Sequence, residues 1–428
     1  PKGLAETLDL RKGDDRGRIY RITGAQPRRV SGTWPGEMDI LQLVELLQHP
    51  ESWWRETAQR LLIERKDRTA TEPLRRLARG GRTPLTQIHA FWTLEGMGAL
   101  DFDVIGEALQ NPRNPRLREH AIRLAELRSG ELLNLAQMAV TDEDPRVRFQ
   151  AALSMGNLPS DKRHARVLFG VVWKDQADEW MQIAVLSSSN GIAGKLLQDI
   201  VAHPFDFLRE PTAAKATFIG RLGSIVGARR DPDEIKVFLN TMTDRPVDLE
   251  TWWQLAAVTG LADALRASGK KLDDVLDDSN DDMKRAAQRV YELTARAREI
   301  ARDAARPAPE RTSAIKLMAH APFSEIREQF QSLLQSQQPV EIQLATVRAL
   351  ATVNDPAVGP LLVEDWASHS PPVRREVLES MFSRRERIEQ LLDAIEAGTL
   401  KAADLDLNRH QQLLNHSVKE IKDRAQIL

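Results

Sequence analysis

Histidine, aspartate and tryptophan are the residues of this sequence most able to do chemistry, because it contains no cysteine. No two of its nine histidines lie three or four residues apart, the spacing that puts two metal ligands on one helix face. The lack of cysteine excludes disulfides, thiolate metal sites, iron–sulfur clusters, cysteine nucleophiles and covalently attached haem. The sequence also contains no Walker A loop and no GxSxG nucleophile elbow. Several histidines begin repeats, where we expect capping or surface roles.

An aspartate-rich stretch near residue 280 raises the question of a calcium site. It contains Asp273, Asp274, Asp277, Asp278, Asp281 and Asp282. An EF-hand loop also needs a glycine for its sharp turn and a glutamate at its last position, and "KKLDDVLDDSNDDMKRAAQRV" has neither. We therefore favour helix capping by Ser279 or Asn280, with Asp281 and Asp282 stabilised by the helix dipole.

Two adjacent tryptophan pairs are candidates for binding a partner. Trp53 and Trp54 form one pair, and Trp252 and Trp253 form the other, each at an expected helix start. Neighbouring side chains on a helix point about 100° apart, so one ring of a pair can enter the core while the other faces a groove or solvent. The two interpretations, core filler and partner-binding anchor, both remain open at this point.

The elements that must position these residues are repeated helices. Segments such as "NPRLREHAIRLAEL" and "DPRVRFQAALSMGNL" share one pattern, in which a small or branched apolar residue recurs about every 30–33 residues. These anchor residues are Ala58, Ala90, Ala121, Ala151, Ala184, Ala314, Ala345 and Val377. Each unit has room for two helices, and stacked helix pairs share a continuous core. The pattern resembles HEAT repeats and predicts an all-α fold, a HEAT-like α-solenoid (an α-α superhelix).

Two kinds of polar residue accompany the anchors. The pairs Asn114-Pro115, Asp144-Pro145 and Ser370-Pro371 combine an N-cap acceptor with a proline at the first helical position. An arginine lies three residues before five of the anchors, namely Arg55, Arg118, Arg148, Arg311 and Arg374. We expect these arginines to make structural contacts between repeats, by reaching a carboxylate or a helix C-terminus in the next repeat.

The sequence divides into four parts. Residues 1–30 contain a lone β segment, "GDDRGRIYRITG", in which Ile19, Tyr20 and Ile22 favour a strand. HEAT-like repeats are expected over 31–190 and 307–428. Between them, the repeat spacing fails over 191–306, where we expect irregular and longer helices.

The amino-acid composition limits the classes of partner that the protein could bind, but it does not identify the function. The 428 residues contain 60 Lys and Arg against 62 Asp and Glu, a net charge of −2. Nothing in this balance favours nucleic acid or anionic lipid as a partner. No apolar run reaches the roughly 18 residues of a membrane span, and no signal peptide opens the sequence.

The stretch "LAETLDLRKGDDRGRIYRITGAQPRRV", from Leu4 to Val30, resembles the end of the β-propeller in haem-binding multidomain proteins of planctomycete type. These proteins are often labelled membrane-bound dehydrogenases or sorbosone-dehydrogenase-like. The resemblance implies that residues 1–30 are the last propeller strand and a linker, and that the HEAT region follows. It also implies a c-type cytochrome domain with a CxxCH motif beyond Leu428. We expect no cofactor in this segment, with haem c confined to that further domain, and an exported or periplasmic setting.

Two classes of function fit these observations. The first is a non-catalytic scaffold of a larger exported dehydrogenase-like protein, which spaces its domains. Its partners would be its own propeller and cytochrome domains, another protein or a polysaccharide. The alternative is a DNA-binding protein similar to HEAT-like DNA glycosylases. We favour the scaffold and expect no nucleic-acid partner, because the near-neutral charge provides no electrostatic footprint for DNA.

Overall fold

The computed structural model describes residues 33–127, 129–159, 162–203, 207–208, 212–242, 252–276 and 281–427. Within these ranges the regular secondary structure consists of α-helices and short 3-10 helices, without a strand. The expected β segment from Gly13 to Gly24 lies outside the described residues, as do the proposed capping residues Ser279 and Asn280. The predicted all-α fold is confirmed over the part that the structure describes.

The chain divides after Leu100 into two compact units. In unit 1 the helix pairs α2–α3 and α4–α5 pack together, and α3 packs against α5. Its helices are η1 (Pro35–Glu37), α2 (Ile40–Leu46), α3 (Ser52–Arg65), η2 (Arg68–Ala70), α4 (Thr71–Gly80) and α5 (Pro84–Gly96).

Unit 2 begins at Asp101 and contains the remaining helices. Its first half comprises α6 (Phe102–Leu109), α7 (Pro115–Ala125), α8 (Ser129–Ala139), α9 (Pro145–Met155), α10 (Lys162–Lys174), α11 (Glu179–Ser187), α12 (Ala193–Ala202), α13 (Ala213–Arg229), α14 (Pro232–Thr241) and α15 (Trp252–Ala267). Its second half comprises α16 (Asp273–Leu276), α17 (Asp281–Arg302), α18 (Ala308–Met318), α19 (Phe323–Leu334), α20 (Val340–Thr352), α21 (Val358–Val363), η3 (Trp366–Ser368), α22 (Pro371–Phe382), α23 (Arg385–Glu396), η4 (Ala402–Asp404), α24 (Leu407–Leu414) and α25 (Lys419–Ala425).

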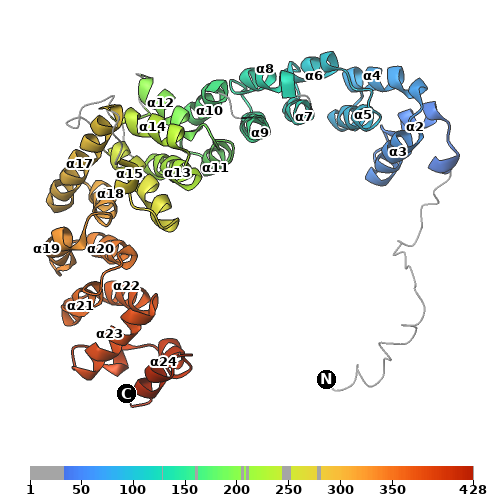
Figure 1. The fold of residues 1–428 in the computed structure, drawn as a ribbon. Coiled ribbons are helices and arrows are strands. Elements are labelled where there is room, and N and C mark those ends of the chain that lie inside the picture. The colour runs from blue at the N-terminus through green and yellow to red at the C-terminus, as the bar shows by residue number, and fades with distance from the viewer. Residues whose placement is uncertain are drawn as a thin grey trace, which may run out of the picture. The chain divides into compact units, whose positions relative to one another are not determined.

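The helices of unit 2 form two layers. In one, which we call the anchor layer, α7, α9, α11, α13, α15, α18, α20 and α22 each pack against the next (Figure 1). In the second layer, α6, α8, α10, α12, α14, α17 and α19 follow one another in the same way, and α21 packs against α23. Neighbouring helices of the two layers also pack across the interface between them, for example α6 with α7 and α17 with α18. This repeated stacking of helix pairs is the arrangement of an α-solenoid.

The predicted anchor residues are confirmed as core residues. All eight are buried, with at most 5% of their surface exposed, on α3, α5, α7, α9, α11, α18, α20 and α22. A small side chain allows two helices to approach closely at each of these points, and larger apolar neighbours such as Leu117 and Val147 fill the space around it.

The helix-entry signals are confirmed in two of the three predicted cases. The side chain of Asn114 accepts a hydrogen bond from the backbone N–H of Leu117, and that of Asp144 accepts from Arg146. Ser370 precedes α22 with an extended backbone, but its side chain makes no capping hydrogen bond. Its Oγ is buried, so the capping prediction for Ser370 was wrong.

The helices over 193–302 include the longest of unit 2, as the sequence predicted. The α13, α15 and α17 helices have 17, 16 and 22 residues, against 11 in α7, α9 and α18. Glycines hold α13 and α15 unusually close, since a Cβ on Gly260 would lie 1.8 Å from the carbonyl oxygen of Gly220. The same two layers continue through this region, although its repeat spacing differs.

Candidate functional site

The arginines before the anchors share one structural role. Each donates hydrogen bonds to backbone carbonyls at the end of the preceding helix or in the turn that follows it. Arg55 reaches the carbonyl oxygens of His49 and Pro50 at 2.6 and 2.7 Å, and Arg374 reaches those of Trp366 and Ala367 at 3.1 and 2.8 Å. Carbonyls at a helix C-terminus lack partners within their own helix, so a buried cation satisfies them well.

Glutamine performs the same task where the arginine is absent. Gln87 also lies three residues before its anchor, and its Nε2 donates to the carbonyl oxygens of Ala78 and Arg79 at the end of α4. Gln182 and Gln343, one position later relative to their anchors, donate to carbonyls in the turns before α11 and α20. These glutamines were not predicted from the sequence, because the expected pattern contained only arginine.

Only two of the five arginines reach a carboxylate in the following repeat. Arg118 binds Asp142 through Nε and Nη2 at 2.6 and 2.8 Å, and Arg148 binds Asp175 in the same manner. These carboxylates raise the pKa of both guanidinium groups. Arg311 reaches the amide oxygen of Gln338 in the following repeat and the carbonyl oxygen of Ala301 before its own helix. We expected all five arginines to reach into the next repeat. This expectation was wrong for Arg55 and Arg374, because their hydrogen-bond partners precede them in the chain.

The first tryptophan pair belongs to an exposed aromatic cluster in unit 1. Trp53 is 52% exposed, Trp54 is half-buried, and the two ring centroids lie 5.0 Å apart. Trp34, 63% exposed, stacks on Trp54 at 6.5 Å and meets the edge of Trp53 at 6.3 Å. We call Trp34, Trp53 and Trp54 the tryptophan cluster. Trp34 was not predicted as a member of this cluster, because it is not adjacent to another tryptophan in the sequence.

The second tryptophan pair is part of the core of unit 2. Trp253 is 1% exposed and Trp252 is 6% exposed. The indole N–H of Trp252 donates to the carbonyl oxygen of Leu208 at 3.0 Å. The prediction that Trp253 binds a partner was wrong, because its buried ring has no surface free for a partner to contact. Only a small part of Trp252 remains accessible, where it lines a groove.

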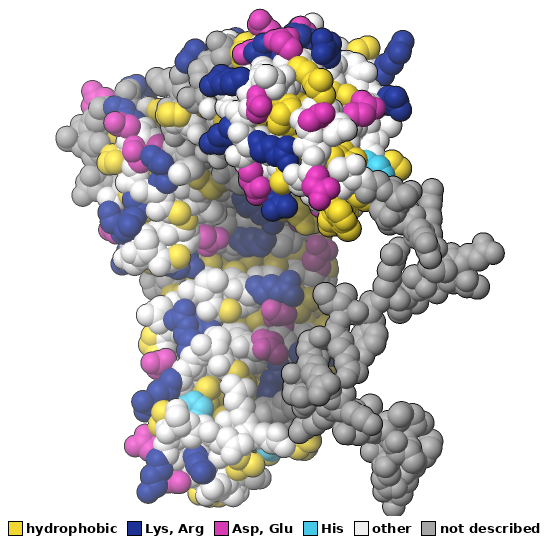
Figure 2. Space-filling model, turned by 90° about the vertical axis from the view of Figure 1, so that its right-hand side faces the viewer, with side chains coloured by type: hydrophobic (Ala, Val, Ile, Leu, Met, Phe, Trp, Pro, Cys, Tyr) yellow, Lys and Arg dark blue, Asp and Glu magenta, His cyan; other side chains and the backbone are white. Residues whose placement is uncertain are grey.

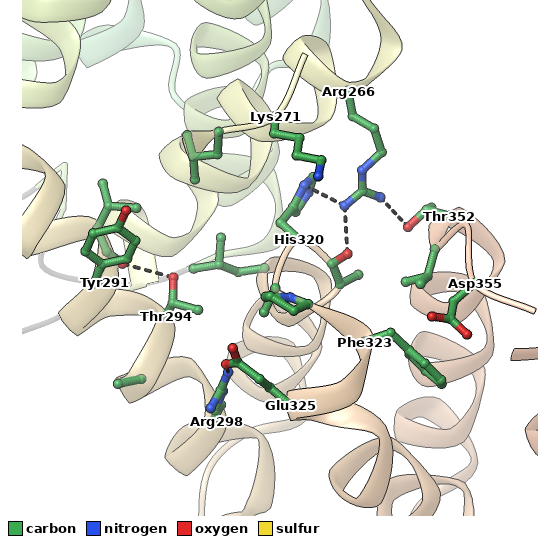
Figure 3. Close-up of a pocket in the computed structure, with 18 of the residues that line it drawn as sticks. Arg266, Lys271, Tyr291, Thr294, Arg298, His320, Phe323, Glu325, Thr352 and Asp355 are labelled. Atoms are coloured by element: carbon green, nitrogen blue, oxygen red, sulfur yellow. Dashed lines mark hydrogen bonds and ion pairs between the residues drawn. The ribbon is translucent and has the colours of Figure 1, made fainter. Parts of the chain in front are cut away.

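A pocket of about 740 Å³ lies between α15, α17, α18, α19 and the end of α20 (Figure 3). Arg266 and His320, which line the pocket, form a hydrogen-bonded chain with Asp263, which belongs to α15 as Arg266 does. Arg266 Nη2 lies 2.6 Å from Nδ1 of His320, and Nε2 of His320 lies 2.9 Å from Oδ1 of Asp263. Arg266 also donates to the carbonyl oxygen of Ala319 and to Oγ1 of Thr352. Arg298 and Glu325 form an ion pair at 2.6 Å on its opposite wall.

This geometry leaves His320 without a free nitrogen for proton transfer. Arginine is always a donor, so Nδ1 of His320 accepts and Nε2–H donates to Asp263. The hydroxyl of Thr352 accepts from Arg266 and donates to the carbonyl oxygen of Ala349 at 2.8 Å. The hydrogen-bonding groups of His320 and Thr352 are therefore taken up by structural contacts.

The aspartate-rich stretch does not form a metal cage in the described residues. Asp274 Oδ2 accepts from the backbone N–H of Lys271 at 2.8 Å, and Asp281 begins α17 beside Lys284. Within the described ranges, no group of three or more His, Asp or Glu side chains is arranged to hold a metal ion. No helix among these residues is both long and apolar enough to cross a membrane.

Some of the histidines lie in turns, and others lie in the core. His49 Nδ1 and His416 Nδ1 accept backbone N–H groups in turns, as expected of capping residues. His164 and His369 are instead buried, with 4% and 3% of their surface exposed, so a surface role does not hold for every histidine. Figure 2 shows positive and negative side chains intermixed over the face in view.

Part of the chain matches a known family of helical repeats. Residues 102–188 match the family described as HEAT repeats. A search of curated proteins gave no match. The chain is similar to the solved structure of Kap121p bound to Ste12p, with 12% identity and a TM-score of 0.41 over 90% of this chain and 48% of that one. For the karyopherin Kap121p bound to the extreme C-terminus of the protein phosphatase Cdc14p, the identity is 12% and the TM-score 0.40, over 92% and 50% of the two chains.

The chain thus spans about half the length of these Kap121p chains. It is also similar to a homology model of the full-length AP-3 complex, with 13% identity and a TM-score of 0.29 over 86% of this chain and 75% of that one. The stacked helix pairs and the match at 102–188 make the fold an all-α solenoid that contains HEAT repeats.

Proposed function

We propose that this chain is the interaction scaffold of a larger exported protein of the dehydrogenase-like, cytochrome-linked type, and that it takes no direct part in redox chemistry. The observation that carries the proposal is the tryptophan cluster. Exposed aromatic rings held against one another offer a large apolar area with little loss of side-chain freedom on binding, and such groups dominate protein interfaces.

A protein partner fits this surface better than DNA does. Interfaces with DNA require clustered lysine and arginine that neutralise phosphates. The intermixed charges on the face shown in Figure 2 support a protein partner instead. The propeller and cytochrome domains implied by the resemblance of residues 4–30 are the first partners to test.

The test uses the propeller encoded before residue 1 in the intact gene, with binding to this chain followed by calorimetry. We expect Trp34→Ser with Trp53→Ser to weaken binding at least tenfold, because both rings are central to the cluster. Trp180→Ser is the matched control, since Trp180 is 71% exposed but lies in unit 2. A gene without a propeller, or equal binding by all variants, would overturn the proposal. Binding to duplex DNA that falls steeply between 50 and 200 mM salt would favour the alternative.

A further inference from the structure

A groove of about 510 Å³ on unit 2 runs between α13, α15 and α18 of the anchor layer. Its floor consists of small residues, among them Ala216 and Gly220 on α13 and Ala256 and Gly260 on α15. These residues lie where the two helix backbones approach most closely, so no long side chain fills the space above them. Trp252 and Pro307 contribute apolar surface to the lining.

Most of the hydroxyl groups that line this groove are directed as acceptors. Five of them donate to carbonyl oxygens of their own helices four residues earlier, at 2.6 to 3.1 Å. They belong to Thr217, Ser224, Thr259, Thr312 and Ser313. A hydroxyl has a single proton, so an oxygen that already donates can only accept from a ligand.

The indole and helix-interior N–H groups of the lining are also engaged, whereas the Thr212 hydroxyl, which accepts from the backbone N–H of Lys215, and the cations of Arg221 and Lys316 remain donors. The indole N–H of Trp252 is bound to the carbonyl oxygen of Leu208. Backbone N–H groups within the helices are bound inside those helices. The five hydroxyl oxygens therefore present acceptors along the groove, which the N–H donors of a ligand would satisfy.

The charged residues of the groove have both signs, and one carboxylate among them is open to a ligand cation. Three carboxylates line it, on Asp263, Glu310 and Glu341, against the two cations of Arg221 and Lys316. Asp263 Oδ1 accepts from neutral His320, and Glu310 pairs with Arg306 at 3.0 Å. Glu341 is exposed and forms no ion pair with the described residues, so its carboxylate is open to a ligand cation.

We propose that this groove binds an extended peptide segment of a partner protein that carries lysine or arginine side chains. The ammonium or guanidinium group lies toward Glu341, the aliphatic stem crosses the Gly and Ala floor, and N–H donors meet the hydroxyl oxygens. The inference rests on the proposed function as an interaction scaffold, but its site is separate from the tryptophan cluster in unit 1.

The test measures fluorescence anisotropy of labelled octapeptides with the full chain. The probes are an acetylated, amidated Ser-Lys-Ser-Gly repeat, its arginine version, and a version in which norleucine replaces lysine. We expect the lysine and arginine peptides to bind and the norleucine peptide to lose most of the affinity. Equal binding of all three, or no binding of the basic peptides at millimolar concentration, would overturn the proposal.

Variants locate the binding in the groove. Glu341→Gln should weaken the lysine peptide about two- to fivefold, the range of an exposed ion pair. Glu328→Gln on α19 is the matched control, because it removes the same charge from an exposed residue outside the groove lining. An equal effect of both variants would show that only the overall charge matters. Competition by a glucan hexasaccharide but not by basic peptides would assign the groove to a polysaccharide and overturn the proposal. Trp34→Ser with Trp53→Ser must leave peptide binding unchanged, which separates this inference from the proposed function.

Discussion

Arg148 and Asp175 are joined by two parallel hydrogen bonds, from Nε to Oδ2 at 2.6 Å and from Nη2 to Oδ1 at 2.5 Å. Both side chains are nearly buried, with 6% and 11% of their surface exposed. One repeat earlier, Arg118 binds Asp142 in the same geometry. Each pair ties an anchor-layer helix to the end of the next helix of the second layer. Adjacent repeats are therefore fixed in register by planar, bidentate contacts as well as by apolar packing.

Replacement of Arg148 by Ala is expected to destabilise unit 2 by about 3 kcal/mol or more, because it leaves the Asp175 carboxylate buried without a partner. Arg148 also donates to the carbonyl oxygens of Asp142 and Glu143, which lose a donor as well. Urea denaturation followed by circular dichroism measures the effect. Arg146→Ala is the control, since Arg146 pairs with Asp144 at an exposed position. An equal loss of unfolding free energy in both variants would show that the buried pair of Arg148 and Asp175 stabilises the fold no more than the exposed pair does.

The anchors could be predicted from the sequence because close helix contacts require small or branched apolar residues. Such residues recur at a regular spacing that can be read from the sequence. Ala121 and Ala151 are found in the core for this reason. The partners of the arginines could not be predicted, because backbone carbonyls have no sequence signature. Gln87 makes such contacts with a different residue type.

The pocket around His320 could not be predicted from the sequence either. Asp263 and Arg266 lie one turn apart on α15, but the loop that brings His320 to them lies more than fifty residues further along. Their contact depends on how α15 packs against α18, which is a tertiary result. The fold class was therefore accessible from periodicity, whereas the candidate sites required the structure.

Gly260→Val should separate α13 from α15. A Cβ at this position would lie 1.8 Å from the carbonyl oxygen of Gly220, and backbone atoms cannot move aside without shifting a whole helix. We expect a loss of at least about 1–3 kcal/mol, the usual range for an overpacked core. Gly106→Ala is the control, because nothing lies within 4 Å of a Cβ there and alanine favours the helix. Thermal melts should place the two variants on opposite sides of the wild type.

Ala151→Asp is expected to split or broaden thermal melting instead of shifting it uniformly. Ala151 is fully buried on α9, so the new carboxylate would lack both water and a partner, at a cost of several kcal/mol. Repeats couple mainly to their neighbours, so those around α9 should open first. Calorimetry shows the separate transition. Leu153→Asp on the same helix is the control, because Leu153 is 36% exposed, and a single sharp transition in both variants would contradict the prediction.

Stability should fall as the pH drops below about 6.5, the ordinary pKa of histidine. Burial lowers the pKa of His320; the hydrogen bond to Asp263 opposes this, while the charge of Arg266 adds to it. The unfolded chain therefore binds a proton at a pH where the folded chain does not, so acid favours unfolding. The contribution is fully present above pH 6.5 and is lost as the pH falls toward the lowered folded pKa. Burial lowers the pKa of His89, His120 and His369 in the same direction.

The variant His320→Gln measures how much His320 contributes to the pH dependence of folding stability. A glutamine can accept from Arg266 and donate to Asp263, so it replaces the two hydrogen bonds without a titrating group. We expect the free energy of unfolding, measured in urea between pH 5 and 7, to depend less steeply on pH in this variant than in the wild type. Asp144 stays ionised throughout this window, since the hydrogen bond from Arg146 lowers its pKa to about 2. Parallel pH profiles in the two proteins would show that His320 is protonated as readily in the folded chain as in the unfolded one, and that Arg266 does not hold it neutral.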